Sequence, residues 1–257
     1  MKKFRKYEKK ISNYIQKLSK LRVKEKLRQL VYKIGIYHIS DFELIKETPS
    51  QKIFPCQVGI LFTGDFNNKL FDKIKVNLEQ IFNSFFYNIR NLGEYTFSKV
   101  LFLKGTKKEF KEKRKSNKKL KLHPTNKFYK ILIDKKKEEN LDIICVITEL
   151  PIFSSKDDNI IFLFGEAQLQ HQCCIVSTLT LNETFYNRNE DQNLFEHRII
   201  KEFIHEIGHL ILGPGHCQNN SCVMRFSKDV EEIDQKSFKL CENCRSNLND
   251  IRERFNF

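Results

Sequence analysis

The sequence lacks any segment that would place the protein in a membrane. None of its apolar runs approaches the ~18 consecutive residues that a membrane-spanning helix needs. Residues 1–10 are charged where a secretory signal peptide has its apolar segment. The basic residues there are mostly lysine and serine is scarce, which does not favour a transit peptide. We therefore expect an intracellular protein, cytoplasmic or nuclear, without membrane insertion.

The chain also lacks the marks of a disordered or repetitive protein. Hydrophobic residues make up 40% of the sequence and include 23 Phe, which is enough for a packed core. We find no internal repeat. A chain of 257 residues can bury a sizeable core as one domain with an appendage. The sequence does not define an oligomeric state, and we expect a monomer.

Acidic residues are scarce in two segments, and the net charge of +14 comes from these. Residues 1–33 contain 13 Lys and Arg against 2 acidic residues, and residues 104–137 contain 15 against 3. Residues 138–257, which carry the histidine motif described below, contain 11 against 20. This distribution argues against a nucleic-acid groove at the histidines. A basic protein that binds nucleic acid through residues 1–33 and 104–137 remains an alternative supported by charge alone.

The N-terminal segment is set apart from the rest of the chain. Apolar residues recur at spacings of three and four over residues 3–34, which predicts one long helix with a solvated basic face. Pro49 and Pro55 predict a linker over residues 47–56. We therefore expect two parts: a basic helical extension and linker over residues 1–50, and one domain over residues 51–257.

Short apolar runs within that domain predict an α/β fold. They indicate strands at residues 57–63, 100–103, 142–148, 160–164 and 173–181, and a helix at residues 68–86. The lysine-rich residues 104–121 predict an exposed loop or a short solvated helix. Strands with helices before and after them indicate an α/β layer rather than a helical bundle.

The sequence from His205 to His209 is His-Glu-Ile-Gly-His, the HExxH pattern of zinc peptidases. We expect a helix over residues 191–212, at about 100° per residue. On it, both histidines share a polar stripe with Arg198 and Glu202. The apolar residues lie on the opposite face: Ile199, Ile200, Phe203, Ile204, Ile207, Leu210 and Ile211. Glu206 falls at the border, beside a histidine-bound metal rather than on it.

This arrangement predicts zinc-dependent hydrolysis of peptide bonds. Neutral imidazoles of His205 and His209 can bind one Zn2+, and a third protein ligand leaves the fourth position for water. Bound zinc lowers the pKa of that water to about 7 and polarises the substrate carbonyl. Glu206 would accept the proton of the water and pass it to the leaving amine.

Four of the eight cysteines follow the histidines closely. Cys217, Cys222, Cys241 and Cys244 end in a C-x2-C pair, which is typical of a metal site. They predict a second, structural zinc. The other four cysteines lie in or beside apolar runs, where thiols usually behave as small core residues: Cys56, Cys145, Cys173 and Cys174.

With these residues in place, the chain resembles the archaemetzincins, zinc metallopeptidases of the metzincin clan. Their pattern is HExxHxxGxxHC, four residues, Cys, one residue and Met, then about seventeen residues and CxxC. Here Cys217, Cys222 and Met224 match, and Cys241-Glu-Asn-Cys244 closes the series. Residues 159–167 and 176–181 also resemble the strands before the family's active-site helix. The resemblance extends over roughly residues 57–250.

The resemblance implies a zincin-type α/β domain. It would contain a mixed twisted β-sheet, a long active-site helix and a C-terminal subdomain with a structural zinc site. The strand at residues 160–167 would form the edge of the cleft and pair with an extended peptide or protein substrate.

The resemblance also implies a role for each site residue. The catalytic zinc would be held by His205, His209 and His216, with Glu206 as general base. Met224 would form the Met-turn beneath the metal. The structural zinc would be held by Cys217, Cys222, Cys241 and Cys244, so we expect two Zn2+ per chain.

The spacing departs from the family pattern at two points. Three residues, Leu210–Leu212, separate His209 from Gly213, where the family has two residues before the glycine. The spacer from Met224 to Cys241 is sixteen residues, one short. Gly213 still precedes His216 by three positions, and Gly213-Pro214-Gly215 allows an unusual turn, so we expect His216 to be the third ligand. The alternative is a catalytically inactive zinc-binding protein that retains only the four-cysteine site.

Overall fold

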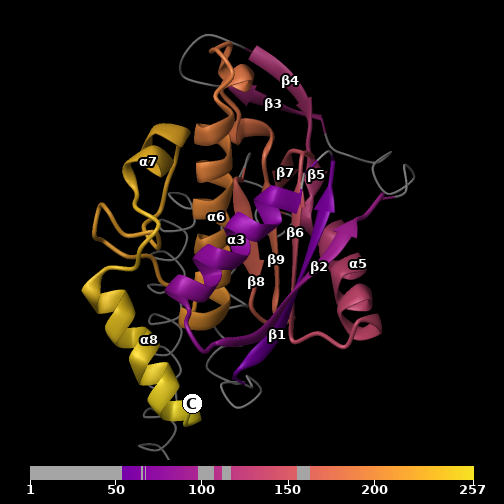
Figure 1. Ribbon diagram of the computed structural model, residues 1–257. Helices are drawn as coiled ribbons and strands as arrows, with labels where there is room; N and C mark the ends of the chain where they lie inside the picture. The colour runs from indigo at the N-terminus through magenta and orange to yellow at the C-terminus, as the bar shows by residue number, and fades with distance from the viewer. Residues whose placement is uncertain (1–53, 65, 67, 98–106, 112–116, 155–162) are drawn as a thin grey trace, which may run out of the picture.

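Five strands form the central sheet of the protein, in the order β2-β1-β6-β9-β8 (Figure 1). The computed structural model describes residues 54–64, 66, 68–97, 107–111, 117–154 and 163–257. The strands are β1 Cys56–Thr63, β2 Phe86–Glu94, β6 Ile143–Thr148, β8 Gly165–Gln168 and β9 Cys173–Ser177. All neighbours are parallel except β8, which runs antiparallel to β9 at the edge of the sheet. The sheet is therefore mixed, as expected for a zincin-type fold.

The central strands are mostly apolar, and both faces of the sheet are covered here. Every residue of β6 and β9 is buried, and in β1 only Gln57 is partly exposed. Continuous apolar runs of this kind are typical of parallel strands enclosed between helices. The cysteines Cys56, Cys145, Cys173 and Cys174 belong to these strands and are buried, as predicted. None of the eight cysteines, all within the described residues, forms a disulfide.

The long helix α6 Gln192–Leu212 lies at the centre of the remaining elements. It contacts β8, β9 and α3 Asn68–Ile81, and it also contacts α7 Val230–Gln235 and α8 Glu242–Phe255. In Figure 1, α7 and α8 lie on the far side of α6 from the sheet. Helix α5 Thr125–Glu138 packs on β6 and β9. As a consequence, residues 196 to 211 of α6 are buried almost without exception, polar side chains included.

Both ends of α6 follow from local sequence. The Asp191 side chain accepts the Leu194 backbone N–H at 2.9 Å and caps the first turn. The helix stops at Gly213, whose φ of 99° is accessible to glycine at little cost. The expected bounds, residues 191–212, are confirmed.

Several other predictions are corrected in detail. The helix predicted for residues 68–86 ends at Ile81, because the chain turns through Ser84 in a left-handed conformation and enters β2. Residues 107–111 and 117–121, predicted as loop or helix, pair as the antiparallel strands β3 and β4. Backbone pairing in such a ribbon does not require an apolar sequence. The smaller elements are β5 His123–Pro124 paired with β7 Ile152–Phe153, and the 3-10 turns η2 Leu179–Leu181 and η3 Glu183–Tyr186.

Some predictions fall outside the described residues. These are the helix over residues 3–34, the linker up to residue 53, the strand over residues 100–103 and the start of the strand over residues 160–164. Within the described residues, no helix is long and apolar enough to cross a membrane.

Candidate metal centres

The two histidines of the HExxH pattern lie one turn apart on α6 and are completely buried. His205 and His209 are 1% and 0% exposed, and their Nε2 atoms are 3.0 Å apart. The segment that follows α6 covers the polar stripe of the helix and so buries these histidines. The stripe predicted to lie opposite the buried face is therefore itself buried, which the helical pattern alone could not indicate.

His216 reaches the other two histidines despite the additional residue before Gly213. Its Nε2 lies 3.2 Å from Nε2 of His205 and 3.1 Å from that of His209. The chain leaves α6 at Gly213, whose N–H donates to the His209 carbonyl at 3.0 Å. The positive φ of Gly213 then directs the next three residues back toward the helix.

Hydrogen bonds on the far side of the rings fix the tautomers of two of these histidines. Nδ1 of His205 lies 2.8 Å from the Val223 carbonyl, and Nδ1 of His209 lies 3.0 Å from the Gly213 carbonyl. A carbonyl oxygen can only accept, so each Nδ1 carries the proton and donates it. Each Nε2 is then left with a lone pair. These lone pairs face one another, which is the arrangement of metal ligands rather than of hydrogen-bond partners.

The spacing of the three nitrogens fits zinc. Imidazole nitrogens bound at about 2.0–2.1 Å in a tetrahedral site lie about 3.3–3.4 Å apart. The observed separations of 3.0–3.2 Å are close to this value. Burial lowers the pKa of His205 and of His216 and lowers the pKa of His209 to about 3, so all three rings are neutral at pH 7.

Glu206 is fully buried between α6 and the edge strand β8. It is 0% exposed, and a Cβ placed on Gly165 would lie 2.5 Å from Glu206 Oε1. Only glycine at the start of β8 leaves room for this carboxylate. Burial raises the pKa of Glu206, and the nearby negative charge of Glu202 raises it further. The sequence pattern identified Glu206 but gave no indication of Gly165.

Met224 packs against α6 at Gly208. A Cβ on Gly208, which lies between the two histidines on α6, would overlap the Met224 sulfur. The Met224 carbonyl accepts the Cys217 N–H at 3.0 Å. The loop around Met224 thus contacts α6 and also holds the segment that carries the third histidine.

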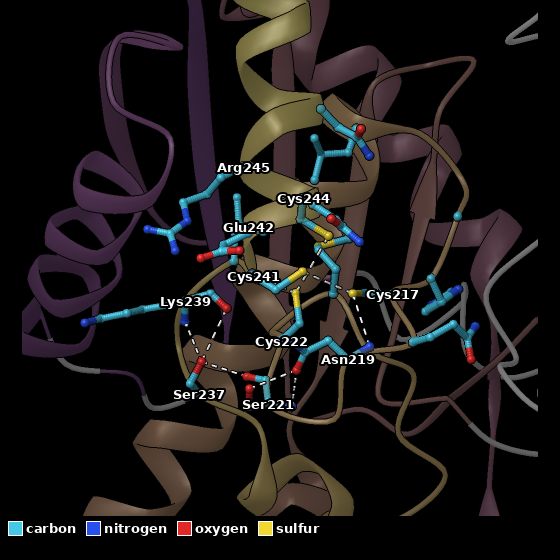
Figure 2. Close-up of a pocket in the computed structure, with 18 residues that line it drawn as sticks. Cys217, Asn219, Ser221, Cys222, Ser237, Lys239, Cys241, Glu242, Cys244 and Arg245 are labelled. Atoms are coloured by element: carbon cyan, nitrogen blue, oxygen red, sulfur yellow. Dashed lines mark hydrogen bonds between the residues drawn. The ribbon is translucent and has the colours of Figure 1, made fainter.

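The four cysteines form a second group, in which their sulfur atoms lie close together (Figure 2). Cys217 Sγ lies 3.4 Å from Cys241 Sγ, and Cys222 Sγ lies 3.8 Å from Cys244 Sγ. All four sulfurs lie within 4.8 Å of one another. Thiolates bound to tetrahedral zinc at about 2.3 Å lie about 3.8 Å apart, so this group also has the size of a zinc site.

Backbone N–H groups donate to two of these sulfurs, while burial raises the pKa of Cys222 to about 11 and also raises the pKa of Cys244. The Asn219 N–H donates to Cys217 Sγ at 3.4 Å, and the Cys241 N–H donates to Cys222 Sγ at 3.3 Å. Burial alone would raise the pKa of Cys241, but hydrogen bonds from the Cys244 backbone and the neighbouring thiols lower it to about 7. A thiolate is the form that binds a metal.

Polar residues earlier on α6 fasten the helix to the segment that follows Met224. The Arg198 guanidinium donates to both Asp234 carboxylate oxygens, at 2.8 and 2.6 Å. Lys236 Nζ lies 3.0 Å from Glu202 Oε1, and both side chains are buried. Sequence reasoning placed Arg198 and Glu202 on the polar stripe but did not identify Lys236. No local pattern marks a partner that lies 34 positions away.

Comparison with known proteins agrees with this geometry. A family model described as Peptidase family M54 matches residues 60–250. The chain belongs to peptidase family M54. The archaemetzincin of Methanocaldococcus jannaschii is 38% identical over 109 residues, which are 42% of this chain and 59% of that protein. The archaemetzincin of Saccharolobus solfataricus is 52% identical over 64 residues, which are 25% of this chain and 34% of that protein. The matches thus span less than two thirds of these relatives, and the resemblance to archaemetzincins is confirmed.

Two solved structures share the fold. A zinc-dependent peptidase from Methanocorpusculum labreanum superposes with a TM-score of 0.55 at 21% identity, covering 75% of this chain and 100% of that chain. The archaemetzincin of Methanopyrus kandleri gives a TM-score of 0.55 at 21% identity, covering 78% and 97%. The predicted α/β fold with a mixed sheet and a long helix is therefore confirmed.

Proposed function

We propose that the protein is a zinc-dependent peptidase. Membership in peptidase family M54 supports this activity, as does the likeness to a protein described as a zinc-dependent peptidase. The observation that carries the proposal is the convergence of three histidine Nε2 atoms at 3.0–3.2 Å. In this proposal His205, His209 and His216 hold the catalytic zinc.

Zinc bound by three imidazoles supplies a Lewis acid that acidifies water and polarises a carbonyl. The protein itself supplies the proton acceptor. The raised pKa of Glu206 makes its carboxylate a stronger base than an exposed one. Glu206 would take the proton of the attacking water at its carboxylate and deliver it to the departing amine nitrogen.

The substrate would be an extended segment of peptide or protein. Among the described residues β8 is the last strand of the sheet, and it runs antiparallel to β9, so a substrate could be added beside it as a further strand. Gly165 in β8 touches Glu206. A peptide held along this edge would therefore lie near the proposed general base.

We further propose a second, structural zinc held by Cys217, Cys222, Cys241 and Cys244. The sulfur spacing and the backbone N–H donors described above support it. Four thiolates fill a tetrahedral site and leave no position for water, so this centre would stabilise the fold and take no part in hydrolysis. Met224 would pack beneath the histidine centre and would not bind the metal.

The substitution Glu206→Gln tests the activity most simply. It removes the proton acceptor but preserves size, so cleavage of a peptide library should fall by about 10²–10⁴-fold. Zinc content should stay at two ions per chain, measured by atomic emission on the same samples. Wild-type activity in the variant would contradict the role of Glu206.

The alternative function is a catalytically inactive zinc-binding protein. It would retain zinc at the four cysteines but cleave no peptide in any library, with or without Glu206. The same assay on the wild-type protein separates the two functions.

A further inference from the structure

A buried lysine connects α6 to the segment that contacts the histidines. The side chains of Lys236 and Glu202 are 1% and 5% exposed, and their charged atoms are 3.0 Å apart. The same ammonium donates to the Arg225 carbonyl at 3.2 Å. Lysine is seldom buried to this degree, and a buried ion pair stabilises a fold no better than a well-packed apolar pair. Stability alone therefore does not account for this lysine.

Lys236 belongs to a short path of contacts that ends at the histidine centre. Three residues further on, the Lys239 carbonyl accepts the Val223 N–H at 3.0 Å. Arg225, which Lys236 contacts directly, lies two residues from Val223 on the other side. The Val223 carbonyl in turn accepts Nδ1–H of His205 at 2.8 Å. A displacement of Lys236 would therefore move Val223 relative to His205.

We propose that Lys236 is a positioning residue of the histidine centre. By binding Glu202 on α6 and the Arg225 carbonyl on the loop, it holds the Val223 carbonyl against His205 and so fixes the ring with Nε2 toward the metal. The inference rests on the proposed zinc site at His205, His209 and His216. Removal of groups that orient a metal-bound histidine typically lowers metal affinity by about 10–100-fold.

The test uses the full chain with the double substitution Lys236→Met and Glu202→Leu. Apolar replacement of a buried ion pair is often neutral or stabilising, so the variant should fold. Titration with Co2+ distinguishes the two centres, because cysteine-bound cobalt shows sulfur-to-metal charge-transfer absorption and histidine-bound cobalt does not. We expect the affinity of the histidine centre to fall by about tenfold and that of the cysteine centre to stay unchanged.

Two controls test whether the effect comes from the position of Lys236 rather than from the lost charge of Glu202 or from general destabilisation of the fold. Glu202→Gln keeps an acceptor for Lys236 and leaves the Arg225 contact, so the affinity of the histidine centre should stay within about threefold of wild type. Lys73 of α3 forms another ion pair with α6, through Glu196. Lys73→Met breaks this pair and should leave the metal affinity of both centres unchanged. If the double variant does not fold, Lys236→Gln combined with Glu202→Gln carries the same test, because the shorter side chain at position 236 loses the Arg225 contact and no unpaired charge is left buried.

Three results would overturn the inference: unchanged affinity of the histidine centre in the double variant, equal weakening of both centres, or a loss in Glu202→Gln as large as in the double variant. Failure of the proposed function looks different. In that case the wild-type histidine centre would bind no metal at all, and the role of Lys236 would fall with it.

Discussion

Close approaches at two glycines determine where the chemistry-bearing side chains lie. Gly208 lets Met224 pack against α6 between His205 and His209, and Gly165 lets Glu206 lie against β8. The neighbouring carbonyls of Val223 and Gly213 fix the rings of His205 and His209. The proposed site thus depends on these two glycines and on backbone carbonyls as much as on its proposed ligands.

Gly165→Ala should lower activity without removing zinc. The added Cβ would lie 2.5 Å from Glu206 Oε1, so the carboxylate must move. Displacement of a catalytic group by about 1 Å can cost about 10²-fold in rate, so we expect a fall in kcat of this order. Steady-state kinetics with parallel zinc analysis provides the measurement.

Gly215→Ala is the matched control, because a Cβ added at Gly215 would meet nothing within 4 Å. Wild-type kinetics in Gly165→Ala would show that Glu206 tolerates the displacement. Loss of zinc would show that the substitution disturbs the ligands instead.

At the scale of elements, α6 and the segment over residues 223–236 form one unit. Arg198, His205 and Gly208 each contact this segment, through Asp234, Val223 and Met224 respectively. The contacts recur along one side of the helix at intervals of seven and three residues. Helix α7 is thereby attached to α6.

Arg198→Met should destabilise the fold strongly. Arg198 is 1% exposed and pairs with Glu183 at 2.6 Å and with Asp234 at 2.6 Å. Removal of one partner of a buried ion pair leaves uncompensated charge and costs about 3–5 kcal/mol, which urea unfolding of the variant should show.

Lys73→Met on α3 provides the comparison, because Lys73 forms its ion pair with Glu196 of α6. Its ion pair with Glu196 has one side chain 51% exposed, so we expect a loss of no more than about 1 kcal/mol. Equal losses of unfolding free energy in the two variants would mean that burial does not strengthen the ion pairs of Arg198.

Elements with strong local patterns could be predicted from the sequence. The apolar stripe predicted α6 over residues 191–212, to within one residue of its observed bounds. Strand β2 was missed because Phe82, Phe85 and Phe86 continue the apolar spacing of the preceding helix, and only the left-handed Ser84 marks the turn. Helix α5 was missed because lysines dominate its composition.

The sequence predicted the proposed ligands of the candidate site. It did not predict the residues that hold these ligands in place. The HExxH and cysteine spacings predicted which side chains would meet. Whether His216 could reach the others depended on the φ of Gly213, which residue counting does not provide. The partners of Glu202 and Arg198 could not be found because they come from a segment more than 30 positions away. Such buried pairs can be identified only in the folded structure.

At the scale of the molecule, the two proposed metal centres share their supporting segments. His216 and Cys217 are consecutive, and Cys222, Val223 and Met224 serve both centres in three successive residues. The hydrogen bond from the Cys217 N–H to the Met224 carbonyl therefore connects the segment that carries His216 to the segment that carries Cys222. We also propose that residues 51–257 form the catalytic domain and that residues 1–50 are an extension to it.

Removal of residues 1–50 should leave both metal centres and peptidase activity in place. All contacts to the proposed ligands described above come from residues 165 to 244, and an independent domain can fold alone. Zinc analysis and the peptide-library assay on residues 51–257 provide the measurement. Loss of zinc from either centre would contradict the proposed boundary.

The central claim is that His205, His209 and His216 hold a zinc ion beside Glu206. Anomalous diffraction at the zinc edge, from crystals of the full chain, tests it most directly. We predict two peaks, one within about 2.0–2.1 Å of all three Nε2 atoms and one within about 2.3 Å of the four cysteine sulfurs. A peak at the cysteines with none among the histidines, or with His216 turned away, would contradict the account.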